Sequence, residues 1–138
     1  MALDNLIMRR KKNTELLTEV ELEFMSHLWK LGQGTVRDVL ANLAEGRNLA
    51  YTSAATILRI LEQKNFVVSI KEGKTFIYKP AIEKDVYQSR SLKNLSEKLF
   101  DDTPVSLVAR LVDDVGMSEE ALEEIRALLD ERLKNGND

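Results

Sequence analysis

Residues 51–80 read YTSAATILRILEQKNFVVSIKEGKTFIYKP, and they predict a helix followed directly by a β-hairpin. We expect the helix to run from about Thr52 to Lys64 and to end at Asn65, because asparagine tolerates the left-handed conformation that closes many helices. Its first turn carries small hydroxyl side chains in place of bulky ones. Such a helix can lie in a groove of DNA, because no large group at its start keeps the backbone away.

The hairpin is indicated by alternating side chains on both arms, a pattern typical of strands. We expect strands over residues 66–70 and 75–78, a charged turn over residues 71–74, and Pro80 as the stop. A helix of this kind followed by a hairpin is the layout of a winged helix-turn-helix, in which a recognition helix reads DNA and the hairpin forms the wing. We therefore predict a mainly α fold with a small β-hairpin.

Two upstream signals complete the three helices of such a domain. Thr18 and Glu21 stand in the relation of a capping box, and Gly32 ends the helix that they begin. Thr35 and Asp38 repeat the pattern for a short second helix, and we expect a very short strand just before Thr35. The packing faces would be formed by Val20, Phe24, Met25, Leu28, Trp29 and Leu31 in the first helix and by Val36, Val39, Leu40 and Leu43 in the second.

The chain of 138 residues has no cysteine and a single histidine, His27. Disulfides, thiolate metal sites and histidine cages are thereby excluded, so we expect no metal and no cofactor. His27 falls beside the apolar face of the first helix and is expected to be a surface or boundary residue. No run of about 18 apolar residues could span a membrane. The basic residues 9–12 follow a short apolar stretch, the reverse of a secretory signal, and we expect a cytoplasmic protein.

Charge is divided unevenly along the chain, although its net value is −3. Residues 1–81 contain twelve Lys/Arg and nine Asp/Glu, a balance of +3, whereas residues 82–138 contain eight and fourteen, a balance of −6. Such an asymmetry permits a part that faces nucleic acid beside a part with another task. For the basic arm over residues 1–17 two interpretations stay open: a solvated tail, or an arm that contacts phosphates or a minor groove.

Residues 82–138 read as three amphipathic helices, with Pro104 at the start of the second and Ser118 as the N-cap of the third. Three such helices bury too little surface among themselves for an independent core, so their apolar faces need a partner. Closed two-fold dimers are the commonest oligomers. We therefore predict a helical dimerisation domain over residues 82–138, after a DNA-binding domain over residues 18–81. The alternative is that these helices fold back on the DNA-binding domain of the same chain.

The hypothesised DNA contacts lie on the third helix and on the wing. The hydroxyls of Thr52, Ser53 and Thr56 can reach base edges or phosphates, and Arg59 is the long cation on that side. Tyr51 would pack on the sugar-phosphate backbone. A plainer role, which we expect for either Thr52 or Ser53, is that of helix N-cap. The complete set of predicted contacts is Tyr51, Thr52, Ser53, Ala55, Thr56, Arg59, Lys71 and Lys74.

Lys71 and Lys74 flank Gly73 at the predicted tip of the wing. Lysines at this place can neutralise DNA phosphates, and they can also merely keep a strand edge from aggregating. Next to a recognition helix, contact with phosphates is the favoured interpretation. The affinity for DNA should then fall steeply with salt.

Four segments of the chain resemble the penicillinase-repressor family (BlaI/MecI/CopY type) of winged-helix transcriptional repressors. The segments are LTEVELEFMSHLW at residues 17–29, TVRDV at residues 35–39, LAYTSAATILRILEQK at residues 49–64 and KEGKTFIYKP at residues 71–80. The likeness is strong over residues 17–81 and extends over the rest in outline. Several linked motifs in the right order are more specific than a lone helix-turn-helix pattern.

The resemblance implies a homodimeric repressor that blocks a promoter by binding an inverted-repeat operator similar to a TACA/TGTA palindrome. In some members of the family, proteolysis in the dimerisation domain ends repression after a membrane sensor detects β-lactams. Copper-responsive relatives use a C-terminal cysteine hook instead. This chain has no cysteine for such a hook, and Arg110-Leu111 stands where the family's Asn-Phe cleavage site would align. Residues 90–120 contain no Asn-Phe pair, so an upstream sensor or protease stays unassigned.

Other classes of function find less support in the sequence. An enzyme would need a nucleophile with a base, a carboxylate cleft, a metal cage or a phosphate loop, and neither G-x-x-x-x-G-K nor G-x-G-x-x-G occurs. We therefore expect no enzyme, and the carboxylates of residues 113–131 fit solvated helix faces. Two alternatives stay open: a winged helix that serves as a protein-interaction module, and a regulator that senses a small molecule between its two parts.

Overall fold

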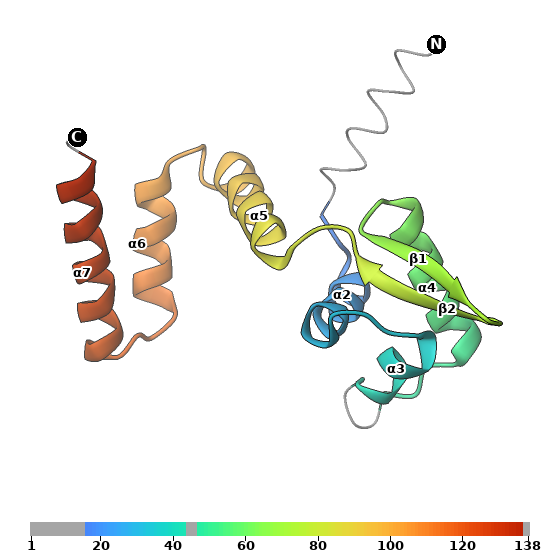
Figure 1. Ribbon diagram of the computed structural model, residues 1–138. Coiled ribbons are helices and arrows are strands. Elements are labelled where there is room, and N and C mark those ends of the chain that lie inside the picture. The colour runs from blue at the N-terminus through green and yellow to red at the C-terminus, as the bar shows by residue number, and fades with distance from the viewer. Residues whose placement is uncertain (1–15, 44–46, 137–138) are drawn as a thin grey trace, which may run out of the picture. The chain divides into compact units, whose positions relative to one another are not determined.

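The computed structural model describes residues 16–43 and 47–136 (Figure 1). Its fold is mainly helical with one two-stranded antiparallel hairpin, as the sequence predicts. The chain divides into two compact units, the first ending at Ser91 and the second beginning at Leu92. Nearly all of the predicted basic arm lies outside the described residues. The elements are α2 (Glu19–Leu31), α3 (Val36–Ala41), α4 (Tyr51–Gln63), β1 (Val67–Glu72), β2 (Thr75–Pro80), α5 (Lys84–Leu99), α6 (Pro104–Asp114) and α7 (Glu119–Asn135).

Helix α2 begins and ends where the sequence predicts, because its termini satisfy their own backbone groups. The Thr18 hydroxyl accepts a hydrogen bond from the Glu21 amide at 3.2 Å, and the Glu21 carboxylate accepts one from the Thr18 amide at 2.9 Å. Gly32 closes the helix with a φ of 88°. Leu31, which was expected on the packing face, is instead 42% exposed, because it is the last helical residue and lies beyond the edge of the core.

Glu21 also joins α2 to the end of α4. Lys64 Nζ lies 2.8 Å from Glu21 Oε2 and 3.0 Å from Glu21 Oε1, and Glu21 is only 7% exposed. Burial raises the pKa of Glu21, but hydrogen bonds from Lys64 and Thr18 and the charge of Lys64 outweigh it, so the net shift of the pKa is downward. The sequence indicated the cap at Glu21 but not this ion pair, because its two members are distant in the chain.

Helix α3 has the predicted cap, and the residue before it adds a short strand segment. Thr35 Oγ1 accepts a hydrogen bond from the Asp38 amide at 3.1 Å, and Asp38 Oδ2 accepts one from the Thr35 amide at 2.9 Å. Gly34 pairs with Tyr78 of β2 through two backbone hydrogen bonds of 2.9 and 2.8 Å. The strand expected just before Thr35 is therefore present as a single bridge at the base of the hairpin.

The hairpin turn is tighter than the sequence suggested. Strands β1 and β2 stay paired up to Glu72 and Thr75, so the loop contains only Gly73 and Lys74. Gly73 has a φ of 66°, and Lys74 is not among the described residues with positive φ, a combination that fits a type II′ turn. The predicted turn over residues 71–74 was too long, because Lys71 and Glu72 belong to β1.

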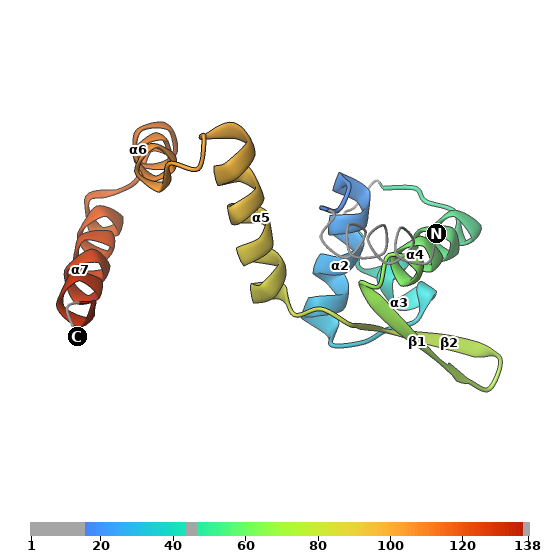
Figure 2. The same ribbon diagram turned by 90° about the horizontal axis from the view of Figure 1, so that it is seen from above.

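The core of the first unit lies where α2, α3 and α4 meet the base of the hairpin (Figure 2). The three helices pack their apolar sides against one another and against β1 and β2. Asn65 ends α4 with a φ of 68°, as predicted, and turns the chain into the hairpin. The buried apolar residues are Phe24, Met25, Leu28, Val36, Val39, Ala54, Leu58, Leu61, Phe66, Val67, Tyr78 and Tyr87.

Tyr87 extends this core past the hairpin into α5. Its ring centroid lies 5.9 Å from those of Trp29 and Phe66, and its hydroxyl accepts a hydrogen bond from the Leu17 amide at 2.7 Å. Trp29 Nε1 also donates to the Ile82 carbonyl at 2.9 Å. The start of α5 therefore belongs to the first unit, and the two units divide inside this helix rather than directly after the hairpin.

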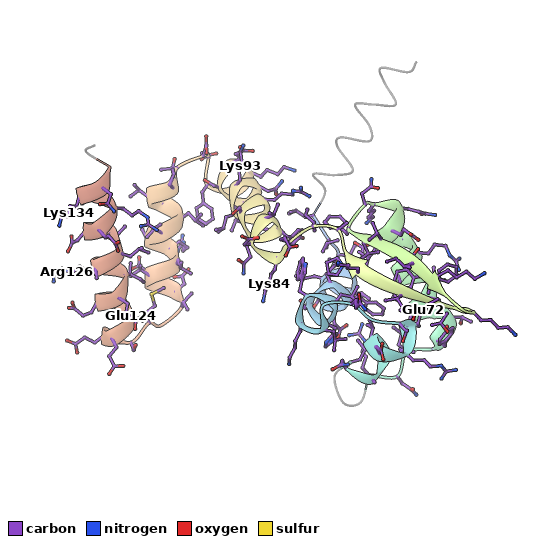
Figure 3. All side chains as sticks on the ribbon, viewed as in Figure 1. Glu72, Lys84, Lys93, Glu124, Arg126 and Lys134 are labelled. Atoms are coloured by element: carbon purple, nitrogen blue, oxygen red, sulfur yellow. The ribbon has the colours of Figure 1, made fainter. Side chains whose placement is uncertain are left out.

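The second unit has a different character. None of the residues described in α6 and α7 is buried. The third helix has the predicted cap, since the Ser118 hydroxyl accepts a hydrogen bond from the Ala121 amide at 3.1 Å. Arg126 and Lys134 point to the side of α7 that faces away from α6 (Figure 3). Apolar residues that stay exposed in this unit include Leu92, Leu95, Leu99, Val105, Val108, Leu111, Val115, Leu122, Leu128, Leu129 and Leu133.

Within the described ranges, no helix is both long enough and apolar enough to span a lipid bilayer.

Candidate nucleic-acid interface

Helix α4 begins one residue earlier than predicted. Its N-cap is Ala50, whose backbone is extended and whose side chain cannot accept a hydrogen bond from the helix. The prediction that Thr52 or Ser53 caps the helix is therefore wrong, because both lie inside the first turn, and both are exposed. The first N–H groups of α4 receive no hydrogen-bond acceptor from the N-cap side chain, and such groups favour an anion at this end.

One side of α4 is buried, and the opposite side is open. Ala54, Leu58 and Leu61 are fully buried and hold the helix on the core. Because a helix turns once in about 3.6 residues, the positions of these residues define which residues lie on the opposite, open side. Ser53 lies at the border of that side. The exposed residues on it are Thr52, Thr56, Arg59, Ile60 and Gln63, and the last two were not predicted from the sequence.

Two of these residues are linked along the helix. The Thr56 hydroxyl donates a hydrogen bond to the Thr52 carbonyl at 2.9 Å. The donor of Thr56 is thereby occupied, while its oxygen can still accept, and the side chain is exposed. Thr56 thus offers an acceptor and an apolar contact, and these are the features that can meet an amino group or a thymine methyl on a base edge.

A groove of about 500 Å³ lies between α4 and the hairpin. The structure brings four of the predicted residues together on it: Tyr51, Ala55 and Arg59 of α4 and Lys74 of the wing. The groove thus has a cation on each wall. The α4 wall consists of Tyr51, Ala55, Arg59 and Glu62, the hairpin wall of Ser69, Lys74, Thr75, Phe76 and Tyr78, and Val36 comes from α3.

Lys71 lies on the same face of the hairpin as the groove. Side chains alternate along a strand, so Lys71 shares a face with Ser69 and with its cross-strand partner Phe76. Its Nζ lies 5.9 Å from the centroid of the Phe76 ring, within the range of a cation–π contact. Glu72 takes the opposite face, near the free end of the hairpin (Figure 3).

Arg37 is a further cation beside α4 that the sequence analysis did not select. It lies in the first turn of α3, is exposed, and places its guanidinium 5.4 Å from the centroid of the Tyr51 ring. The contact connects α3 to the wall of the groove. No local pattern announced it, because it depends on how α3 and α4 pack.

Glu62 is the acidic member of the groove, and it contacts the wing. Its Oε2 accepts a hydrogen bond from Ser69 Oγ at 2.5 Å. Burial raises the pKa of the nearby Tyr78 hydroxyl, the negative charge of Glu62 raises it further, and Arg59 acts in the opposite direction. Tyr78 is therefore protonated at neutral pH. Neither Glu62 nor Ser69 was predicted from the sequence, because the contact between them depends on how the hairpin packs against α4.

These features define the class of the protein: it is a winged helix-turn-helix protein, with α3 and α4 as the helix-turn-helix and the hairpin as the wing. The family model described as "Penicillinase repressor" matches residues 17–131. The chain therefore belongs to the penicillinase repressor family, a family of DNA-binding transcriptional repressors. The resemblance read from the sequence is confirmed.

Several relatives are similar over most of the chain. The penicillinase repressor of Bacillus licheniformis is 24% identical over 120 residues, which are 87% of this chain and 94% of that protein. The methicillin resistance regulatory protein MecI of Staphylococcus aureus is 22% identical over 116 residues, 84% of this chain and 94% of that protein. A solution structure of monomeric BlaI from Bacillus licheniformis with the blaP half-operator covers 53% of this chain and 89% of that chain, at 27% identity and a TM-score of 0.45.

Proposed function

We propose that the protein is a homodimeric repressor that acts in the cytoplasm on an inverted-repeat operator. One α4 helix would enter the major groove of each half-site, and each wing would lie on the phosphate backbone. Thr52, Ser53, Thr56 and Arg59 would read the bases. The sugar-phosphate backbone at the edge of the major groove would be contacted by Tyr51, Ala55, Lys71 and Lys74.

The observation that carries this proposal is the exposed side of α4, small at its start (Thr52, Ser53, Thr56), beside a groove with a cation on each wall. The major groove is about 12 Å wide and admits a helix, and small side chains let the start of α4 come close to the bases. Arg59 can reach a guanine edge or a phosphate from that side. Lys71 and Lys74 project from the hairpin, where phosphates would pass, and each phosphate neutralised adds about 0.9 to the salt slope.

The homodimer is supported by the exposed apolar side chains of the second unit. Helices α6 and α7 contain no buried residue among those described, although leucine and valine recur along both. Monomeric proteins rarely expose apolar patches of more than a few hundred Å². A second copy of the same segment would cover both sets at once. A two-fold dimer would also match the symmetry of an inverted repeat.

The proposal can be tested by selecting sequences from a random DNA pool with the full-length protein. The winning duplex and a scrambled duplex are then titrated by fluorescence anisotropy at two salt concentrations. We expect an inverted repeat, two chains per duplex, and binding that weakens steeply with salt. Selection of no common sequence, or equal affinity for both duplexes, would contradict the proposal.

Arg59→Ala sharpens this test. Removing one specific interaction with a base costs about 1–3 kcal/mol, so we expect a loss of affinity for the selected duplex of about tenfold or more. Lys79→Ala is the matched control, because Lys79 is an exposed cation on the opposite face of the hairpin from Lys71. If both variants bind the duplex with equally reduced affinity, α4 does not read the bases.

A further inference from the structure

We infer that the hydrogen bond between Glu62 and Ser69 is a positioning contact, which holds the wing at the distance from α4 that DNA binding requires. The inference rests on the proposed function. It names two residues that affect DNA binding without touching DNA. Ser69 and Glu62 act through Lys74, whose place opposite Arg59 they fix.

The contact is short and joins two different elements. Ser69 Oγ on β1 donates to Glu62 Oε2 on α4 at 2.5 Å, and both residues are half-buried. Hydroxyl-to-carboxylate hydrogen bonds of this length belong to the charge-assisted class, which is roughly twice as strong as the neutral one. The pair is therefore able to hold a strand against a helix.

Its location explains why the wing needs it. The base of the hairpin is fixed by the buried Val67 and by the Gly34–Tyr78 bridge. Beyond Ser69, every residue of β1 up to the turn is exposed. Ser69 is thus the last side chain of β1 that is held by α4 before the free end. An isolated two-stranded ribbon is marginally stable in water, so its free end takes its direction from the last fixed point.

The charge of Glu62 calls for an explanation as well. Glu62 lines the same groove as Arg59 and Lys74, where a carboxylate would repel a phosphate. In the observed arrangement, one of its oxygens receives the Ser69 hydroxyl instead. A role in holding the wing would explain why a carboxylate lies in a groove that is otherwise suited to anions. Because its replacement also changes the charge of the groove, Ser69 is the better residue to alter.

The test compares Ser69→Val with Ser69→Thr in the full chain. The two variants have nearly the same shape, but threonine keeps the hydroxyl and valine does not. We expect Ser69→Val to weaken binding to the selected duplex about threefold, no more than Lys74→Ala does, and to lower the salt slope likewise, by about 0.9 for each phosphate that is no longer neutralised. Ser69→Thr should retain the affinity and slope of the unaltered protein. Fluorescence of Trp29 verifies that each variant is folded.

A double-mutant cycle decides whether Ser69 acts through Lys74. If it does, adding Ser69→Val to Lys74→Ala weakens binding little further, because coupled residues are not additive. Full additivity of the two losses in affinity would overturn the inference. It would also be overturned if Lys74→Ala binds DNA weakly while Ser69→Val binds it with unchanged affinity. A different result bears on the proposed function: if Arg59→Ala and Lys74→Ala both bind normally, the assigned interface itself is wrong.

Discussion

In the first unit, the apolar sides of α2, α3 and α4 meet a hairpin and bury one another, and the rings of Trp29, Phe66 and Tyr87 complete the core. In the second unit, helices that also have apolar sides leave their leucines and valines exposed. The same kind of sequence pattern thus yields a finished core in one unit and an unpartnered surface in the other. What differs is the presence of a partner element within the chain, and this is why we propose that the second unit associates with a second copy.

The largest effect should come from breaking the core of the first unit. Phe24→Ala removes a fully buried ring, and we expect the free energy of unfolding to fall by about 3–5 kcal/mol. Urea denaturation followed by Trp29 fluorescence measures this, since Trp29 is the single tryptophan and packs beside Tyr87. Leu22→Ala, on the exposed side of the same helix, is the control and should cost under about 1 kcal/mol. Equal costs would contradict the described core.

A substitution in the second unit should act on association instead. Leu111→Asp places a charge on the exposed apolar side of α6, and we expect the dimer to dissociate about a hundredfold more readily, since a charge without a partner is costly to bury. Sedimentation velocity over a range of concentrations measures this change. Urea denaturation of the first unit should stay unchanged. Arg110→Ala, the neighbouring exposed residue, should leave the dimer intact, and a dimeric Leu111→Asp protein would contradict the assignment.

Removing the two lysines of the wing should have a smaller effect, and the effect should be on the affinity for DNA. In the double variant Lys71→Ala/Lys74→Ala we expect DNA affinity to fall about tenfold at moderate salt, and the salt slope to fall in proportion to the number of phosphates that these lysines neutralise. Affinity measured at several salt concentrations gives both quantities. The dimer and the unfolding transition should not change. An unaltered slope would show that these lysines do not meet phosphates.

The smallest effect concerns pH. Glu21→Gln keeps the capping box but removes the ion pair with Lys64, and we expect a loss of about 1 kcal/mol at neutral pH. The pKa of Glu21 lies below its ordinary value of 4.5 in the folded protein, so its contribution is complete above that value and disappears as the pH falls through the lower folded value. Urea denaturation at neutral and at acid pH should therefore show a difference between the two proteins that vanishes in acid. A difference independent of pH would contradict the ion pair.

Local patterns predicted the elements of the fold well, because helix caps and strands depend on residues that are close together in the sequence. The capping boxes at Thr18 and Thr35, the left-handed Asn65 and the cap at Ser118 all follow from short-range chemistry. The N-cap of α4 was misplaced, because Ala50 begins the helix without the polar side chain that the rule expects.

Contacts between distant elements could not be predicted in this way. The ion pair of Glu21 and Lys64 and the burial of Tyr87 depend on how helices pack, and no local pattern encodes them. The same holds for Arg37 against Tyr51. The predicted DNA-binding residues were chosen from helical spacing and charge. The side chains that contact them from other elements could be identified only in the structure.

We propose that the first unit reads DNA and that the second unit joins two copies of the chain. This proposal is tested most directly by titrating the unaltered protein and Leu111→Asp against an inverted-repeat duplex and against a single half-site. We predict that the unaltered protein binds the inverted repeat far more tightly than the half-site, while Leu111→Asp binds both with the same weak affinity as the unaltered protein on the half-site. If the two proteins bind the inverted repeat equally tightly, the division of labour between the units is wrong.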